Sequence, residues 1–331
     1  MDNKTDKSNI KEILSDFYNN QNFCGFVAFV VMKTDPKLKI ISLSEDKNDD
    51  GKTFREVLKD LIFTVINDCY LIQEVEYIDG TYLADNQNKI FVINQSGEFK
   101  PFDFLENKNI VEYFDINDLD DACGIIFRLR KGRKTIWCYQ HIWSLMVPNR
   151  KKNNIMARIN KFENHTVFEQ QNDRLFTITK KIDILIIDGC VVTSNTKLLQ
   201  NNFGFQNYIY QSAENAVSNI VAKKLVSNSE KLTEYIYRGK PKYAKKMMRI
   251  SNSQVFILSK EELLDKISFV ERWKGKFCVD DSTNQIVLNT YKDVENLIDL
   301  FDERFTRSEI TGKEYDTDVK IVAEPIIANA R

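Results

Sequence analysis

Apolar residues along the chain follow two periods, one typical of strands and one typical of helices. Runs rich in β-branched and aromatic residues predict strands at 25–32, 38–43, 71–78, 89–94, 124–130, 135–145, 166–169, 175–179, 183–187 and 190–193. Apolar residues spaced three and four apart predict helices at 9–18, 54–65, 209–221, 242–250, 260–273 and 291–301. A small hairpin is predicted to join 277–279 to 286–288. Strands dominate the first part and helices the last, so the pattern predicts an α+β protein.

Three units are predicted within the 331 residues. Residues 1–120 form an acidic N-terminal α/β unit, 121–195 a basic β-rich unit with hairpins, and 196–331 a mainly helical C-terminal unit. The first boundary is expected near 115–121. With only 11 glycines and 5 prolines, long flexible linkers are scarce, so the units should pack against each other.

Charge is distributed unevenly although the net charge is only −1. Residues 1–120 carry 13 basic and 23 acidic side chains, 121–250 carry 23 and 9, and 251–331 carry 11 and 16. No carboxylate occurs between Asp121 and Glu163. Such asymmetry predicts a polyanionic partner. The alternative is that the basic middle docks on acidic segments of the same chain.

Three groups of cations are the candidate DNA-binding residues. The first lies on the hairpin of residues 124–145, the second is a short run after it, and the third follows Pro241 on one helical face at positions i, i+3, i+4 and i+7. Like charges at this helical spacing repel by a few tenths of a kcal/mol per pair, which favours phosphate binding over a purely structural role. The residues are Arg128, Arg130, Lys131, Arg133 and Lys134; Arg150, Lys151 and Lys152; and Lys242, Lys245, Lys246 and Arg249.

Aromatic side chains alternate along the second strand of the same hairpin, at Trp137, Tyr139, His141 and Trp143. One interpretation is a face on which bases stack, since base–aromatic stacking tolerates any sequence. The other, which the pattern favours, is an aromatic core in which the imidazole is hydrogen-bonded.

Enzymatic chemistry has weaker support. A metal-dependent nuclease needs carboxylates around a divalent ion and a lysine near the attacking water. Two sets of residues match this loosely, and the pattern favours the interpretation that these acids only cap strands and turns. They are Glu98 and Lys100 with Asp79 or Asp85, and Asp183 with Asp188. The six cysteines lack zinc-binding spacing, and we predict no catalytic residue, metal site or cofactor.

Membrane insertion by this chain is not expected, because no apolar run approaches the roughly 20 residues that span a bilayer. The first seven residues are polar and of mixed charge, unlike a secretory signal. A cytoplasmic protein is therefore expected.

The order of several short segments resembles the KwaB family, the soluble component of the bacterial Kiwa anti-phage defence system. The segments are Ile-Ser-Leu-Ser at 41–44, Tyr-Gln-His-Ile-Trp-Ser at 139–144 before the run at 150–152, Asp-Ile-Leu-Ile-Ile-Asp at 183–188, Phe-Gly-Phe at 203–205, and Arg-Phe-Thr-Arg-Ser-Glu-Ile-Thr-Gly at 304–312.

This resemblance implies a DNA-binding, non-enzymatic effector that obstructs phage DNA replication or transcription. It also implies a homodimer that a membrane-embedded KwaA-like protein recruits to the inner face of the membrane. It assigns no role to any single residue. The alternatives are a metal-dependent nuclease of a defence system and an adaptor that binds only proteins.

Overall fold

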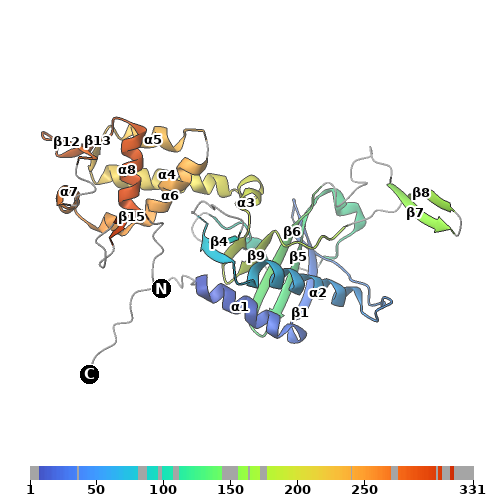
Figure 1. Cartoon of the computed structure of the whole chain (residues 1–331). Coiled ribbons are helices and arrows are strands. Elements are labelled where there is room, and N and C mark those ends of the chain that lie inside the picture. The colour runs from blue at the N-terminus through green and yellow to red at the C-terminus, as the bar shows by residue number, and fades with distance from the viewer. Residues whose placement is uncertain are drawn as a thin grey trace, which may run out of the picture. The chain divides into compact units, whose positions relative to one another are not determined.

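The computed structural model describes residues 7–35, 37–80, 88–95, 99–106, 112–143, 156–162, 165–171, 177–239, 241–269, 275–302, 305–307 and 314–316. The chain divides into two compact units, one within residues 1–203 and one within 204–331 (Figure 1).

An eight-stranded sheet organises the first unit, in the order β2-β1-β5-β6-β9-β10-β4-β3. Neighbouring strands are antiparallel except for β3 and β4, which are parallel. The strands are β1 (Gly25–Met32), β2 (Leu38–Ile40), β3 (Glu76–Asp79), β4 (Lys89–Asn94), β5 (Ala122–Lys131), β6 (Lys134–His141), β9 (Ile184–Ile187) and β10 (Cys190–Thr193). A separate antiparallel pair is formed by β7 (Met156–Phe162) and β8 (His165–Gln171).

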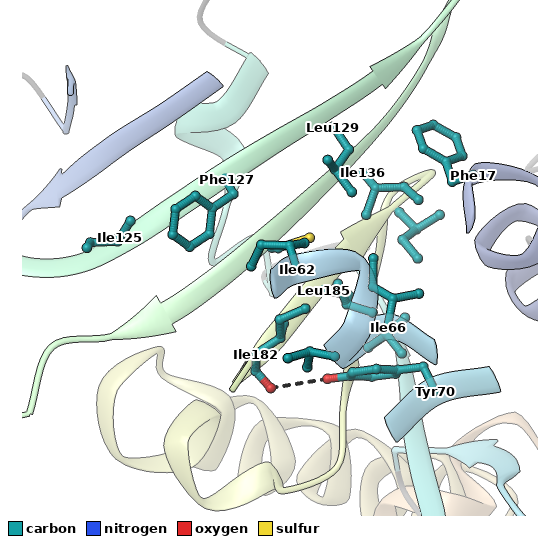
Figure 2. Packing of buried hydrophobic residues seen from close by; sticks show 14 of the residues in the cluster. Phe17, Ile62, Ile66, Tyr70, Ile125, Phe127, Leu129, Ile136, Ile182 and Leu185 are labelled. Atoms are coloured by element: carbon teal, nitrogen blue, oxygen red, sulfur yellow. Dashed lines mark hydrogen bonds between the residues drawn. The ribbon is translucent and has the colours of Figure 1, made fainter. Parts of the chain in front are cut away.

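Helices α1 (Lys7–Asn19) and α2 (Phe54–Ile66) cover one face of this sheet (Figure 1). Thr53 caps α2 through a capping box with Glu56, which satisfies two of the backbone groups at the helix start. Figure 2 shows side chains from both helices and from β5, β6 and β9 packed into one apolar layer. Tyr70 lies at its edge and donates a hydrogen bond of 3.3 Å to the carbonyl of Ile182. This layer is the main core of the unit.

Shorter elements complete the first unit. A π-helical turn covers Asn67–Leu71, 3-10 turns cover Gln21–Phe23, Asp103–Glu106 and Ile116–Asp120, and α3 covers Thr196–Asn202.

The second unit is mainly helical. Its helices are α4 (Phe205–Ala222), α5 (Glu230–Ile236), α6 (Pro241–Arg249), α7 (Lys260–Phe269) and α8 (Tyr291–Phe301), with 3-10 turns at Ile250–Asn252 and Gln254–Ile257. Small sheets are formed by β11 (Val226–Ser227), β12 (Cys278–Asp280) and β13 (Gln285–Val287), and by β14 (Phe305–Arg307) with β15 (Glu314–Asp316). The apolar stripe predicted for α4 is buried from Ile209 to Ile220, whereas Val221 is exposed.

The predicted α+β class is confirmed, and most predicted elements occur at or near their expected positions. The boundary expected near residue 120 is wrong, because β5 pairs with β1 from Ala122 to Arg130 and one sheet spans both proposed units. The strand expected at 71–78 begins only at Glu76, after the π-helical turn. The strand expected at 175–179 is absent from the described residues 177–179.

Gly124 in β5 generates a stability prediction, because the ring of Tyr139 occupies the space that a side chain would fill. A Cβ at this position would lie 2.2 Å from Cε2 of Tyr139. Gly124→Ala should therefore destabilise the protein by about 1–3 kcal/mol through overpacking. Gly25→Ala is the matched control, since its Cβ meets only a carbonyl oxygen at 3.7 Å and should change stability little. Urea unfolding measures both.

A double-mutant cycle identifies the cause. In a Tyr139→Leu background the penalty of Gly124→Ala should shrink, because the ring that it displaces is gone. An equal penalty in both backgrounds would contradict this explanation.

Candidate nucleic-acid interface

The hairpin of β5 and β6 presents the first group of cations at its turn. Lys131 pairs with Lys134 in the last register position, and Gly132 takes a φ of +59° in the turn between them. Arg130, Arg133 and Lys134 are exposed. Alternation along β5 places Phe127 and Leu129 in the core beneath the helices, so Arg128 and Arg130 belong to the opposite face of the sheet.

Arg128 lies over two neighbouring aromatic rings on that face. Its guanidinium carbon lies 5.5 Å from the ring centroid of Phe29 and 5.6 Å from that of Trp137, and the two centroids are 5.9 Å apart. Burial and the neighbouring Arg130 lower the pKa of Arg128, but a guanidinium remains charged at neutral pH. The stack is a cation–π arrangement that fixes a positive charge beside the exposed hairpin end.

Lys131 is engaged within the chain instead. Its ammonium nitrogen lies 2.6 Å from a carboxylate oxygen of Asp16 on α1. Both side chains are partly exposed, so this ion pair contributes at most about 1 kcal/mol. The alternative, that basic residues contact acidic segments of the same chain, is therefore correct for Lys131 and Asp16.

The second group, Arg150, Lys151 and Lys152, lies outside the described residues.

The third group does not form the solvated face that its spacing predicts. Lys245 is only 6% exposed, and its ammonium lies 5.9 Å from the ring centroid of Phe205 in α4; burial lowers its pKa. Arg249 forms a largely buried ion pair with Asp302, and Lys246 lies 3.8 Å from a carboxylate oxygen of Glu295.

Only Lys242 of this group is exposed. The prediction fails because α6 packs against α4, α5 and the turn at Ile250–Asn252, so most of its circumference is enclosed. The spacing places the four cations opposite the apolar face of α6, but Phe205, Glu295 and Asp302 lie against that side as well, and local spacing cannot reveal partners so distant in sequence.

The aromatic residues of β6 have different environments. Tyr139 is buried, and its hydroxyl donates to the carbonyl of Cys123 at 3.2 Å and lies 3.1 Å from Nδ1 of His141. Burial raises the pKa of Tyr139 well above its usual value. The core interpretation thus applies to Tyr139, whereas Trp143 is 49% exposed beside the imidazole.

The two carboxylates of the second nuclease set, Asp183 and Asp188, do not lie together. Asp183 precedes β9, accepts a hydrogen bond of 2.8 Å from the backbone N–H of His141 and lies 2.5 Å from the ammonium of Lys181. Asp188 follows β9 in a tight turn, so strand β9, rising about 3.3 Å per residue, separates the two acids.

Glu98 and Asp85 lie outside the described residues. Within the part of the chain that is described, no group of three potential metal ligands occurs.

Arg238 is a functional candidate that the sequence analysis missed. It follows α5, is exposed, and its guanidinium carbon lies 4.1 Å from the ring centroid of Tyr291 on α8. Its nearer aromatic partner in space, Tyr291, is 53 residues away in sequence, so local spacing gives little sign of the contact. The neighbouring pair Tyr237 and Arg238 before Pro241 is the only local signal.

The fold and these surfaces define the class, an α+β protein in which a mixed eight-stranded sheet carries an exposed cationic hairpin and precedes a helical unit. A family model described as Kiwa protein KwaB-like matches residues 119–311, more than half of the chain. The chain belongs to this KwaB-like family and is a Kiwa anti-phage defence protein. The resemblance noted in the sequence is thus confirmed, and the matched segment includes β5, β6 and all of α4 to α8.

No curated protein and no solved structure matches the chain. Among the helices in the described residues, none is both long enough and apolar enough to span a membrane.

The ion pair of Arg249 generates a second stability prediction. Arg249→Gln removes the cation beside Asp302, whose side chain is only 10% exposed, and breaking a buried pair from one side costs about 3–5 kcal/mol. Lys242→Gln removes the same charge from an exposed position of the same helix and should change stability by less than about 0.5 kcal/mol. Chemical unfolding followed by circular dichroism at 222 nm compares them. Equal stability of the two variants would contradict the buried pair.

Proposed function

We propose that the protein acts in phage defence by binding DNA largely without sequence specificity, through the exposed end of the β5–β6 hairpin. The action proposed is obstruction of phage DNA replication or transcription by binding, without catalysis. Recruitment to the membrane by a KwaA-like partner and a homodimeric state are parts of the proposal that rest on family membership.

The observation that supports this proposal most directly is the exposure of the cations at the hairpin end and their lack of ion pairs among the described residues. Arg130, Arg133 and Lys134 are exposed, and within the described residues none of them has an ion pair. Exposed, uncompensated cations are the groups that exchange counterions for phosphates, and phosphate contacts carry no sequence information. The hairpin end therefore has the chemistry for sequence-independent DNA binding.

The shape of the hairpin also supports the proposal. β1 pairs with β5 as far as Arg130 and β9 pairs with β6 only from Ile136, so the turn at 131–135 extends beyond both neighbouring strands. Arg128 adds a charge that Phe29 and Trp137 hold in place, so less side-chain entropy is lost when it meets a phosphate. Anchored and exposed cations thus occur together on one rigid element.

Salt dependence tests the proposal. The variant Arg133→Gln/Lys134→Gln should bind duplex DNA more weakly, and the slope of log K against log salt should become shallower by about 2, since each phosphate contact contributes about −0.9. The loss should be equal on two duplexes of unrelated sequence. Fluorescence anisotropy over a salt series gives both quantities.

The matched control is Lys33→Gln/Lys47→Gln, which removes two exposed charges from the N-terminal part of the same unit. This variant should keep the wild-type slope. An equal effect of both variants would mean that net charge alone is responsible for binding. If the wild type does not bind duplex DNA at low salt, an adaptor that binds only proteins would be favoured. Nicking of a plasmid with Mg²⁺, lost in Asp183→Ala, would instead support the nuclease alternative.

A further inference from the structure

A second cationic surface, in the helical unit, consists of Arg238, Lys242, Tyr243 and Tyr291, and we call it the tyrosine–cation surface. Arg238 follows α5, Lys242 and Tyr243 belong to the first turn of α6, and Tyr291 begins α8. Three helix ends, separated by up to 53 residues of sequence, meet at this surface. None of its residues except Lys242 was among the sequence-based candidates.

The two cations lie over the two tyrosine rings. Arg238 is 4.1 Å from the ring centroid of Tyr291 and 5.5 Å from that of Tyr243, and the ammonium of Lys242 is 4.8 Å from the centroid of Tyr243. Stacking of this kind orients a guanidinium while leaving its donors and its other face accessible to a ligand. The surface is therefore preorganised.

A buried third ring supports the surface from behind. Tyr235 is fully buried, and its ring centroid is 5.0 Å from that of Tyr243, edge to face, and 6.3 Å from that of Tyr291. Its hydroxyl lies 3.4 Å from a carboxylate oxygen of Glu295. Since Tyr243 and Tyr291 are partly buried against this ring, little freedom remains to be lost on binding.

Arg238 and Lys242 differ from the neighbouring lysines, which have carboxylate partners. Lys231 lies 2.6 Å from Glu234, and Lys246 and Lys292 lie 3.8 and 4.0 Å from Glu295. Arg238 and Lys242 have no ion pair among the described residues. Lys231 also lies over the ring of Tyr291, 5.6 Å from its centroid, but it is paired with Glu234, which accepts a hydrogen bond of 3.4 Å from the Tyr291 hydroxyl. Of the cations over the two rings, Arg238 and Lys242 are thus the two available for an anion.

A further exposed aromatic ring belongs to the residue next to Arg238 in the sequence. Tyr237, the residue before Arg238, is 53% exposed, and its ring is stacked parallel on Tyr210 at 5.4 Å with an interplanar angle of 4°. Its hydroxyl is hydrogen-bonded to Glu214. A flat, exposed ring that is fixed on its other side is a platform for a nucleobase.

We infer that the tyrosine–cation surface, extended by Tyr237, binds single-stranded nucleic acid through stacking on its planar groups and phosphate contacts to Arg238 and Lys242. Unpaired bases expose the π-faces that such groups recognise, whereas a duplex hides them. The hairpin, with cations at an exposed turn, fits duplex phosphates instead. This inference does not depend on the proposed function, because it concerns another unit and another form of nucleic acid.

The test uses the full chain and a fluorescein-labelled oligo(dT) of about 16 nucleotides, the upper end of the site sizes known for single-strand binders. Arg238→Gln/Lys242→Gln should lower the affinity about tenfold or more and make the salt slope shallower by about 1.4, since single strands contribute about −0.7 per contact. Lys224→Gln/Lys266→Gln, which removes two exposed charges from other elements of this unit, is the matched control and should keep wild-type affinity.

A charge-preserving variant separates stacking from simple attraction. Tyr291→Leu keeps every cation but removes the ring under Arg238, and should lower oligo(dT) affinity about fivefold or more, the lower end of measured aromatic stacking effects. Circular dichroism confirms that each variant is folded. Wild-type affinity of folded Tyr291→Leu, or no binding of oligo(dT) by the wild type at low salt, would overturn the inference.

The hairpin variant Arg133→Gln/Lys134→Gln distinguishes the two proposals. It should lose duplex affinity and keep oligo(dT) affinity, and Arg238→Gln/Lys242→Gln should do the reverse. If the hairpin variant leaves duplex binding unchanged while oligo(dT) binding still depends on Arg238, the proposed function fails and this inference stands. Equal losses on both ligands in both variants would overturn the inference.

Discussion

The hydrogen-bonded position of β5 between β1 and β6 is the constraint on which the first unit depends. It places Phe127 and Leu129 in the core under α1 and α2, and strand alternation then requires Arg128 and Arg130 to lie on the other face. A register shift of one residue would bury the arginines and expose the apolar side chains, so the hydrophobic core itself fixes the cationic face. Core and proposed interface are thus two sides of one strand.

Ion pairing separates the cations of this protein into two kinds. Lys131, Lys245, Lys246 and Arg249 are engaged or buried within their own units, where they contribute to packing and charge balance. Another set is exposed and uncompensated among the described residues, or stacked on aromatic rings, and this set supports both nucleic-acid proposals. It consists of Arg128, Arg130, Arg133, Lys134, Arg238 and Lys242. Net charge by segment cannot make this distinction, because it counts both kinds alike.

Local signals in the sequence predicted local structure well. The capping box of Thr53 and Glu56 starts α2, and the Asp188-Gly189 turn joins β9 to β10, because each depends on residues within a few positions of each other. The boundary near residue 120 and the solvated face of α6 were wrong because each is decided by partners far away in sequence, β1 in the first case and α4 in the second. Arg238 was missed for the same reason.

Lysine reactivity tests the central claim, that the exposed hairpin end and not the basic segment in general contacts duplex DNA. Acetylation of the full chain by a lysine-selective reagent, quantified by mass spectrometry with and without saturating duplex, reports each ammonium group separately. The account predicts strong protection of Lys134, with little change at Lys131, which Asp16 already engages, and none at Lys47. Unchanged reactivity of Lys134 in a complex that demonstrably contains DNA would contradict it.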